Sequence, residues 1–171
     1  MDEYWDIYDK NRVFQNRTIR RGDVFRDGEY YVCCEVWFLN SKGEMLITQR
    51  HPAKKAGGLW EFIGGGVLAG ETTAQAAVRE VKEEIGVFLT ENDLALLHVY
   101  CQKNYFMDIY LVNIDVDVKT VVLDENETVD AKWVSKADLQ TMIVNQNVVR
   151  SVAQRYNMLK DKLYLHKSNK N

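Results

Sequence analysis

The chain has 171 residues and 46% hydrophobic content, enough to bury the core of one domain, and no change in composition divides it. Its net charge of −3 and pI of about 5.7 exclude a general attraction to nucleic acid or to membrane surfaces. We therefore expect one domain over residues 1–165, with residues 1–29 as an N-terminal extension packed on it and residues 166–171 as a disordered tail.

The cellular location follows from what the sequence lacks. No apolar run is long enough to cross a membrane, and the start of the chain does not resemble a signal peptide, so we expect a cytoplasmic protein. The cysteines are Cys33, Cys34 and Cys101, an odd set, and the first two are neighbours in a predicted strand, where their side chains point to opposite faces. This pattern predicts buried free thiols rather than disulfides.

Hydrophobic periodicity and turn residues predict strands and helices in alternation. Strands are predicted at residues 30–40, 45–50, 60–63, 94–102, 105–118 and 131–134. Helices are predicted at residues 73–85, 138–143 and 145–163. This order indicates the α/β class, with a mixed β-sheet flanked by helices on both sides.

The most informative stretch runs from Gly65 to Val87 and has the pattern Gly-x5-Glu-x7-Arg-Glu-Val-x-Glu-Glu-x-Gly-Val. Within it, Thr72 and Gln75 form a capping-box pattern, and Gly86 is suited to end a helix in the left-handed conformation. The sequence therefore predicts a helix of about three turns between these signals.

Three glutamates share one face of this helix. At about 100° per residue, Glu80, Glu83 and Glu84 fall in one arc, apart from the apolar stripe. Ala76 and Ala77 lie one turn earlier on the same side, and we expect them to leave space for ions and phosphate. Crowded carboxylates repel each other, and a hard divalent cation such as Mg²⁺ removes that repulsion.

The residues around the carboxylates have expected roles as well. Glycines at 64–66 and 70 predict a loop that adopts positive φ and brings bare backbone close to a ligand, with Gly65 offering a carbonyl to the metal. Arg79 precedes Glu83 by four residues and is expected to hold its carboxylate. Glu71 is expected to be structural, accepting backbone hydrogen bonds near the helix start.

The stretch from Gly65 to Val87 resembles the Nudix box, the signature of hydrolases that cut diphosphate linkages with magnesium. The resemblance implies a Nudix-like α/β/α sandwich, a single Nudix hydrolase domain and a small-molecule diphosphate as the substrate. It implies Mg²⁺, or alternatively Mn²⁺, as the cofactor. The implied metal ligands are Glu80, Glu83, Glu84 and Gly65.

Outside the box, the chain resembles the Nudix branch related to isopentenyl diphosphate isomerase. The similar segments are residues 4–9, 21–24, 35–40, 43–44, 48–50 and 58–60. In that isomerase the matching arginine and lysine contact the diphosphate, which implies substrate binding by Arg50 and Lys54. The isomerase also needs a cysteine after the Gly-Leu-Trp motif, and residues 61–67 contain none. Hydrolysis is therefore favoured, with an isomerase and a non-catalytic ligand-sensing module as the alternatives.

A mechanism follows in which metal held by the box glutamates neutralises the diphosphate and activates a water. A carboxylate takes the proton, and the sequence leaves this general base open among Glu80, Glu83 and Glu127 of the loop at 124–127. The substrate is also open among nucleoside diphosphate derivatives, nucleoside triphosphates, coenzyme diphosphates and prenyl diphosphates. A homodimer is neither required nor excluded.

Overall fold

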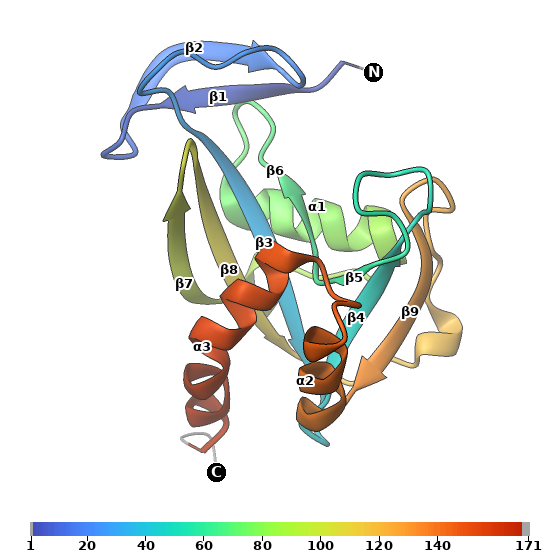
Figure 1. The fold of residues 1–171 in the computed structure, drawn as a ribbon. Coiled ribbons are helices and arrows are strands. Elements are labelled where there is room, and N and C mark those ends of the chain that lie inside the picture. The colour runs from blue at the N-terminus through green and yellow to red at the C-terminus, as the bar shows by residue number, and fades with distance from the viewer. Residues whose placement is uncertain (1, 169–171) are drawn as a thin grey trace.

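The structure is a computed structural model that describes residues 2–168 (Figure 1). Its strands are β1 (Tyr4–Tyr8), β2 (Phe14–Arg20), β3 (Tyr31–Leu39), β4 (Met45–Arg50), β5 (Trp60–Glu61), β6 (Ile63–Gly66), β7 (Ala95–Gln102), β8 (Tyr105–Asn113) and β9 (Thr128–Val134). Its helices are α1 (Thr73–Ile85), α2 (Lys136–Val144) and α3 (Arg150–Ser168), with short 3₁₀ turns η1 (Glu91–Asp93) and η2 (Val118–Thr120). Strands are thus present in every predicted place.

A mixed sheet forms the centre of the molecule. Within residues 2–168 it has seven strands in the order β5-β4-β3-β8-β7, while β6 pairs antiparallel with β3 and β9 antiparallel with β4. Strands β3 and β8 run parallel over their full lengths. The hairpin of β1 and β2 is a separate sheet that lies across one end of the central one (Figure 1). The predicted mixed sheet is confirmed.

Two apolar clusters hold the helices on opposite faces of this sheet. On β3, Val36 and Phe38 belong to the cluster under α1, whereas Trp37 and Leu39 belong to the cluster under α2 and α3. This is the period of two expected of a strand buried on both faces. The result is the predicted α/β/α arrangement, with α1 behind the sheet and α3 in front in Figure 1.

Helix α1 has the predicted caps. The Thr72 hydroxyl accepts a hydrogen bond from the Gln75 backbone, the Gln75 side chain accepts one from the Thr72 backbone, and Gly86 ends the helix at φ 68°. The prediction for Ala76 and Ala77 was wrong, because both are fully buried against the sheet. Their small side chains bring the helix close to the strands rather than leaving space for ions.

The C-terminal helix begins later than predicted. Residues 147–149 are extended and pair with β5: Trp60 N–H donates to Asn147 O, and Val149 N–H donates to Trp60 O, both at 2.9 Å. These bonds compete with helical ones, so α3 starts at Arg150 rather than at residue 145. It continues through Ser168, past the predicted start of the tail at residue 166, and residues 169–171 lie outside the described part of the chain.

The N-terminal extension is a hairpin that is tied to the sheet by a buried ion pair. Arg12, in the turn between β1 and β2, donates from Nη1 and Nη2 to the two carboxylate oxygens of Asp108 on β8, each at 2.7 Å. Asp108 is buried and also accepts a hydrogen bond from the Thr73 hydroxyl. Trp5 of β1 stacks on Tyr31 of β3, with ring centroids 4.7 Å apart and planes at 9°. The hairpin therefore packs on the central sheet.

The cysteines fit the prediction only in part. All three are free, Cys34 is buried and Cys33 is half-buried, but Cys101 is exposed. Cys101 lies on β7, a strand at one edge of the sheet. None of the helices within residues 2–168 is long and apolar enough to cross a membrane.

Candidate active site

An acidic cavity of about 320 Å³ lies where α1, β6, the end of β4 and the loop before β9 meet. It contains every residue that the sequence indicated for metal, catalysis or substrate: Arg50, Lys54, Gly65, Glu80, Glu83, Glu84 and Glu127. Five further polar residues, which the sequence did not indicate, also line it: Glu3, Arg21, Glu61, Asp124 and Thr128. The fold thus gathers positions more than seventy residues apart into one charged space.

Arg79 ties together the acidic face of α1. Its Nη1 donates to Glu80 Oε1 at 2.8 Å and to Glu83 Oε2 at 3.1 Å, so the predicted pair with Glu83 is present. Its Nε and Nη2 donate to both oxygens of Glu71, and Nη2 also reaches the carbonyl of Gly66. Arg79 therefore fixes α1 to the strand and orients two of the carboxylates.

Glu71 has the structural role that was expected. Its Oε2 accepts a hydrogen bond from the Leu68 backbone N–H at 3.0 Å, which closes the turn before α1. The bonds from Arg79 and Leu68 hold the pKa of Glu71 below its usual value, although its partial burial acts in the opposite direction.

The deepest carboxylate of the cavity is Glu84. Burial raises its pKa well above the usual value, and the nearby charges of Glu61 and Glu80 raise it further. Its Oε1 accepts a hydrogen bond from the Gly64 backbone N–H at 3.2 Å. Burial also raises the pKa of Glu80, despite the opposing effect of Arg79. These carboxylates lie in an environment that disfavours uncompensated negative charge.

The glycines of β6 allow neighbouring side chains to approach the strand backbone closely, and they do not form a loop. Residues Gly64–Gly66 belong to β6 and pair with Glu35, Cys34 and Cys33 of β3, so the predicted loop was wrong at these positions. A Cβ on Gly65 would lie 2.2 Å from Glu80 Oε1, and one on Gly66 would lie 2.5 Å from Trp5 Nε1. Of the four glycines, Gly70 adopts the expected turn conformation, with φ 83°. The bare strand lets a carboxylate pack against its backbone on one side.

The two predicted substrate-binding cations are already paired with carboxylates. Arg50 Nη1 donates to Glu61 Oε1 at 2.5 Å, and Arg50 Nε donates to the carbonyl of Lys55 at 2.8 Å. Lys54 forms an ion pair with Glu127, whose backbone carbonyl accepts a hydrogen bond from His51 N–H. Each cation must therefore exchange or share its partner to bind a phosphate.

The donor set fits a hard divalent cation, since the cavity presents carboxylate oxygens beside bare strand backbone. Within residues 2–168, however, no three acidic, histidine or cysteine side chains converge in a metal-binding arrangement. Arg79 and the Gly64 backbone hold the carboxylates in the positions where they stand. Metal binding at this site therefore requires that side chains turn toward one another.

Glu61 is the residue whose omission from the sequence analysis matters most. It follows Trp60 in the short strand β5 and directs its carboxylate into the cavity beside Glu84. Burial raises its pKa despite the ion pair with Arg50. A charged residue within a predicted strand of otherwise apolar residues is a signal that would have identified it.

A mixed sheet between helices, with a glutamate-bearing helix over a charged cavity, defines the class of this protein as a pyrophosphohydrolase, an enzyme that hydrolyses diphosphate linkages. Residues 32–154 match the NUDIX domain family, and the chain belongs to that family. It is 32% identical over 142 residues to an uncharacterised Nudix hydrolase of Listeria monocytogenes, covering 82% of this chain and 84% of the relative.

Solved structures show the same fold. Protein DR0079 of Deinococcus radiodurans superposes with a TM-score of 0.73 at 22% identity, covering 90% of this chain and 98% of that one. The NUDIX domain of NrtR from Shewanella oneidensis, solved in complex with ADP ribose, superposes with a TM-score of 0.64 at 16% identity, covering 81% and 90%. The predicted fold class is thus confirmed.

Proposed function

We propose that this pyrophosphohydrolase depends on Mg²⁺, with Mn²⁺ as an alternative, and cleaves a nucleoside diphosphate derivative or a related small diphosphate. The observation that carries the proposal is one cavity shared by the α1 glutamates and by Arg50 and Lys54. Carboxylates for a hard cation and basic groups for phosphate oxygens are the two requirements for binding a diphosphate. Hydrolysis adds water across the P–O–P linkage and yields two phosphate products.

In this proposal Glu80, Glu83, Glu84 and the Gly65 backbone hold the metal. When bound, the ion neutralises diphosphate oxygens and lowers the pKa of a coordinated water. Arg79 keeps Glu80 and Glu83 oriented toward the cavity. The general base that takes the proton from water is Glu80, Glu83 or Glu127, and Glu127 belongs to the loop before β9.

Nucleoside diphosphate derivatives stand first among the substrates because a domain of the same fold, from Shewanella oneidensis, was solved with ADP ribose. The branch related to isopentenyl diphosphate isomerase is the alternative. One observation favours keeping it: Cys33 lines a pocket next to the acidic cavity. Burial raises the pKa of that thiol to about 12, so it is neutral and unsuited to act as a base near pH 7.

A substrate panel tests the proposed function. ADP-ribose, UDP-glucose, nucleoside triphosphates, coenzyme A and prenyl diphosphates are incubated with enzyme and Mg²⁺, and released phosphate or nucleotide is measured. We expect metal-dependent hydrolysis of at least one nucleoside diphosphate derivative, abolished by a chelator and restored by Mg²⁺. Isopentenyl diphosphate in deuterated water provides the isomerase arm, and deuterium in dimethylallyl diphosphate without hydrolysis of any compound would reject the proposal.

Arg50→Ala is expected to weaken substrate binding more than it slows the chemical step. Removing a ground-state phosphate contact raises KM by about tenfold and lowers kcat by less than about threefold. Steady-state kinetics on the best substrate of the panel measure both. Because Arg50 also pairs with Glu61, the double variant Arg50→Ala/Glu61→Gln is the control for the unpaired carboxylate. An unchanged KM in both variants would exclude Arg50 from substrate binding.

A further inference from the structure

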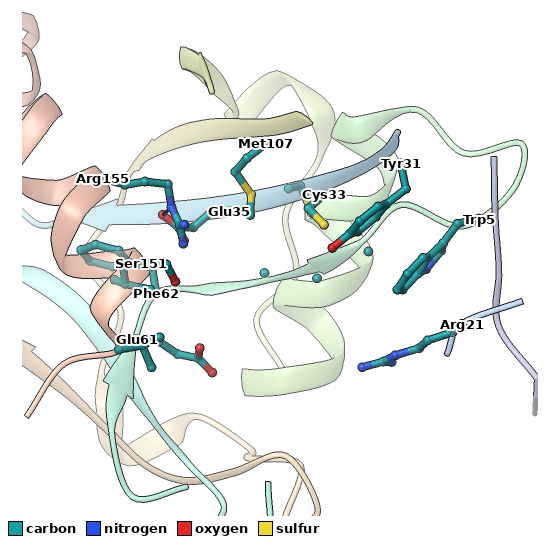
Figure 2. A pocket seen from close by; sticks show the side chains of 16 residues that line it. Trp5, Arg21, Tyr31, Cys33, Glu35, Glu61, Phe62, Met107, Ser151 and Arg155 are labelled. Carbon is teal, nitrogen blue, oxygen red and sulfur yellow. Dashed lines mark hydrogen bonds and ion pairs between the residues drawn. The ribbon is translucent and has the colours of Figure 1, made fainter. Parts of the chain in front are cut away.

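Glu61 is a carboxylate of the acidic cavity to which the proposed function gives no role. It lies in β5, just before the glycine strand β6. In Figure 2 its side chain lies on one side of that strand, while Glu35 and Arg155, which form a buried ion pair, lie on the other. The guanidinium that contacts Glu61 is that of Arg50, at 2.5 Å.

Backbone hydrogen bonds fix both residues of this pair. Glu61 stands opposite Thr48 in the antiparallel pairing of β5 with β4. Arg50, the last residue of β4, donates from its N–H to Leu59 O and accepts a hydrogen bond from Gly58 N–H, both at 3.0 Å. Because neither backbone can shift without breaking such bonds, the relative position of the two residues is set before a substrate arrives.

The Arg50 guanidinium is held at two of its three nitrogens. Its Nε donates to the carbonyl of Lys55 at 2.8 Å, and its Nη1 donates to Glu61 Oε1 at 2.5 Å. Contacts at two different nitrogens of a planar group fix the orientation of its plane. Within residues 2–168, Nη2 of Arg50 has no hydrogen-bond partner, and Arg50 lines the acidic cavity. The N–H groups of Nη2 are therefore available to the oxygens of a phosphate.

Other carboxylates compete for this guanidinium. Glu84 lies near enough to Glu61 for the charge of Glu61 to raise the pKa of Glu84, and Glu80 and Glu83 line the same cavity. An arginine side chain without an anchor gains rotamer freedom and is able to pair with one of these glutamates. Such a pair would take the cation from the phosphate and a carboxylate from the metal. An anchor on β5 prevents both.

We propose that Glu61 is a positioning residue, which holds the Arg50 guanidinium at the wall of the acidic cavity, with Nη2 left for a phosphate oxygen and away from the metal-binding glutamates. Glu61 acts through Arg50 and touches neither substrate nor metal. The proposal rests on the proposed function, which makes Arg50 a phosphate ligand. It predicts a change of sign: Glu61 assists diphosphate binding while Arg50 is present and opposes it once Arg50 is gone, because an unpaired carboxylate repels the anion.

Binding of methylenediphosphonate, a diphosphate analogue that resists hydrolysis, tests this without turnover. Isothermal titration calorimetry with Mg²⁺ gives its Kd for Glu61→Ala and Glu61→Gln, each made in wild type and in Arg50→Ala. In wild type, Glu61→Ala is expected to raise the Kd at least about fivefold, whereas Glu61→Gln, which keeps an acceptor for Nη1, stays within about threefold. In Arg50→Ala, the change Glu61→Ala no longer weakens binding and lowers the Kd by about twofold.

Glu29→Ala is the matched control. Glu29 forms an ion pair with Arg17 at the same 2.5 Å, and neither residue lines the cavity, so the Kd should equal that of wild type. Circular dichroism checks that each variant folds. If Glu61→Ala is unfolded, Glu61→Asp replaces it: the shorter side chain keeps the charge and loses its reach, so the Kd should rise in wild type and stay unchanged in Arg50→Ala.

The proposal is overturned if wild type does not bind the analogue, or if Glu61→Ala leaves the Kd of wild type unchanged. It is also overturned if Glu61→Ala weakens binding in both backgrounds, or if it raises the Mg²⁺ concentration needed for binding in both, which would make Glu61 a metal ligand. The substrate panel tests the proposed function separately. If no compound is hydrolysed while the analogue binds and the sign changes, the proposed function fails and the positioning role of Glu61 stands.

Discussion

Glu84→Gln is expected to lower kcat by at least about 10²-fold while leaving the fold intact, because it removes a charge that acts in the transition state. The amide oxygen of glutamine still accepts the hydrogen bond from Gly64 N–H. The substitution also removes a buried negative charge from beside Glu61 and Glu80, so the melting temperature of the protein should be unchanged or higher. Steady-state kinetics at saturating Mg²⁺ and thermal unfolding measure the two effects.

The matched control for Glu84→Gln is Glu125→Gln. Glu125 is exposed and stands in the same acidic loop as Glu127, but it does not line the cavity, so its variant should keep wild-type activity. The Glu→Gln substitution at Glu80 and at Glu83 shows which residue is the general base and which is a metal ligand. Loss of a metal ligand raises the Mg²⁺ concentration needed for activity, whereas loss of the general base lowers kcat and leaves the metal affinity unchanged. Near wild-type activity of Glu84→Gln would remove this residue from the site.

Arg155→Met is expected to cause the largest loss of stability. Among the residues that the structure describes, it leaves the Trp37 indole as the hydrogen-bond partner of the buried Glu35 carboxylate. Breaking such a buried pair costs about 3–5 kcal/mol of unfolding free energy. For a chain of this length, that loss lowers the melting temperature by roughly 6–20 °C. Urea unfolding followed by circular dichroism measures the free energy directly.

Two further variants show whether the loss comes from the unpaired charge. Glu35→Gln/Arg155→Met removes both charges and keeps an acceptor for Trp37, so it should recover at least half of the lost stability. Arg150→Met, at the exposed start of the same helix, should stay within about 0.5 kcal/mol of wild type. A loss from Arg155→Met below about 1 kcal/mol would mean that water reaches the pair.

Features set by local sequence could be predicted. Helix α1 begins at Thr72 and ends at Gly86 as expected, since a capping box and a left-handed glycine act within a few residues. The three glutamates share a face because helical spacing is fixed, and the pair of Arg79 with Glu83 was predicted from its spacing of four residues. Arg50 and Lys54 were predicted as substrate-binding residues from a family resemblance, and both line the cavity.

Features set by contacts between distant segments could not be predicted. Gly64–Gly66 resemble a loop in sequence and form a strand because β3 lies alongside. Residues 147–149 have helical periodicity and are extended because Trp60 offers them backbone hydrogen bonds. The partners of Arg50 and Lys54 come from β5 and the loop before β9, and no local pattern indicates either pairing.

The ion pair between Arg12 and Asp108 bears on how far the chain can be truncated from its N-terminus. A chain shortened to residue 32, where the family match starts, would keep every box residue. It would also leave the Asp108 carboxylate buried in the sheet without its guanidinium, and it would remove both rings of the stacked pair Trp5 and Tyr31. We therefore expect a chain trimmed to the shared domain to be less stable than one that keeps the hairpin.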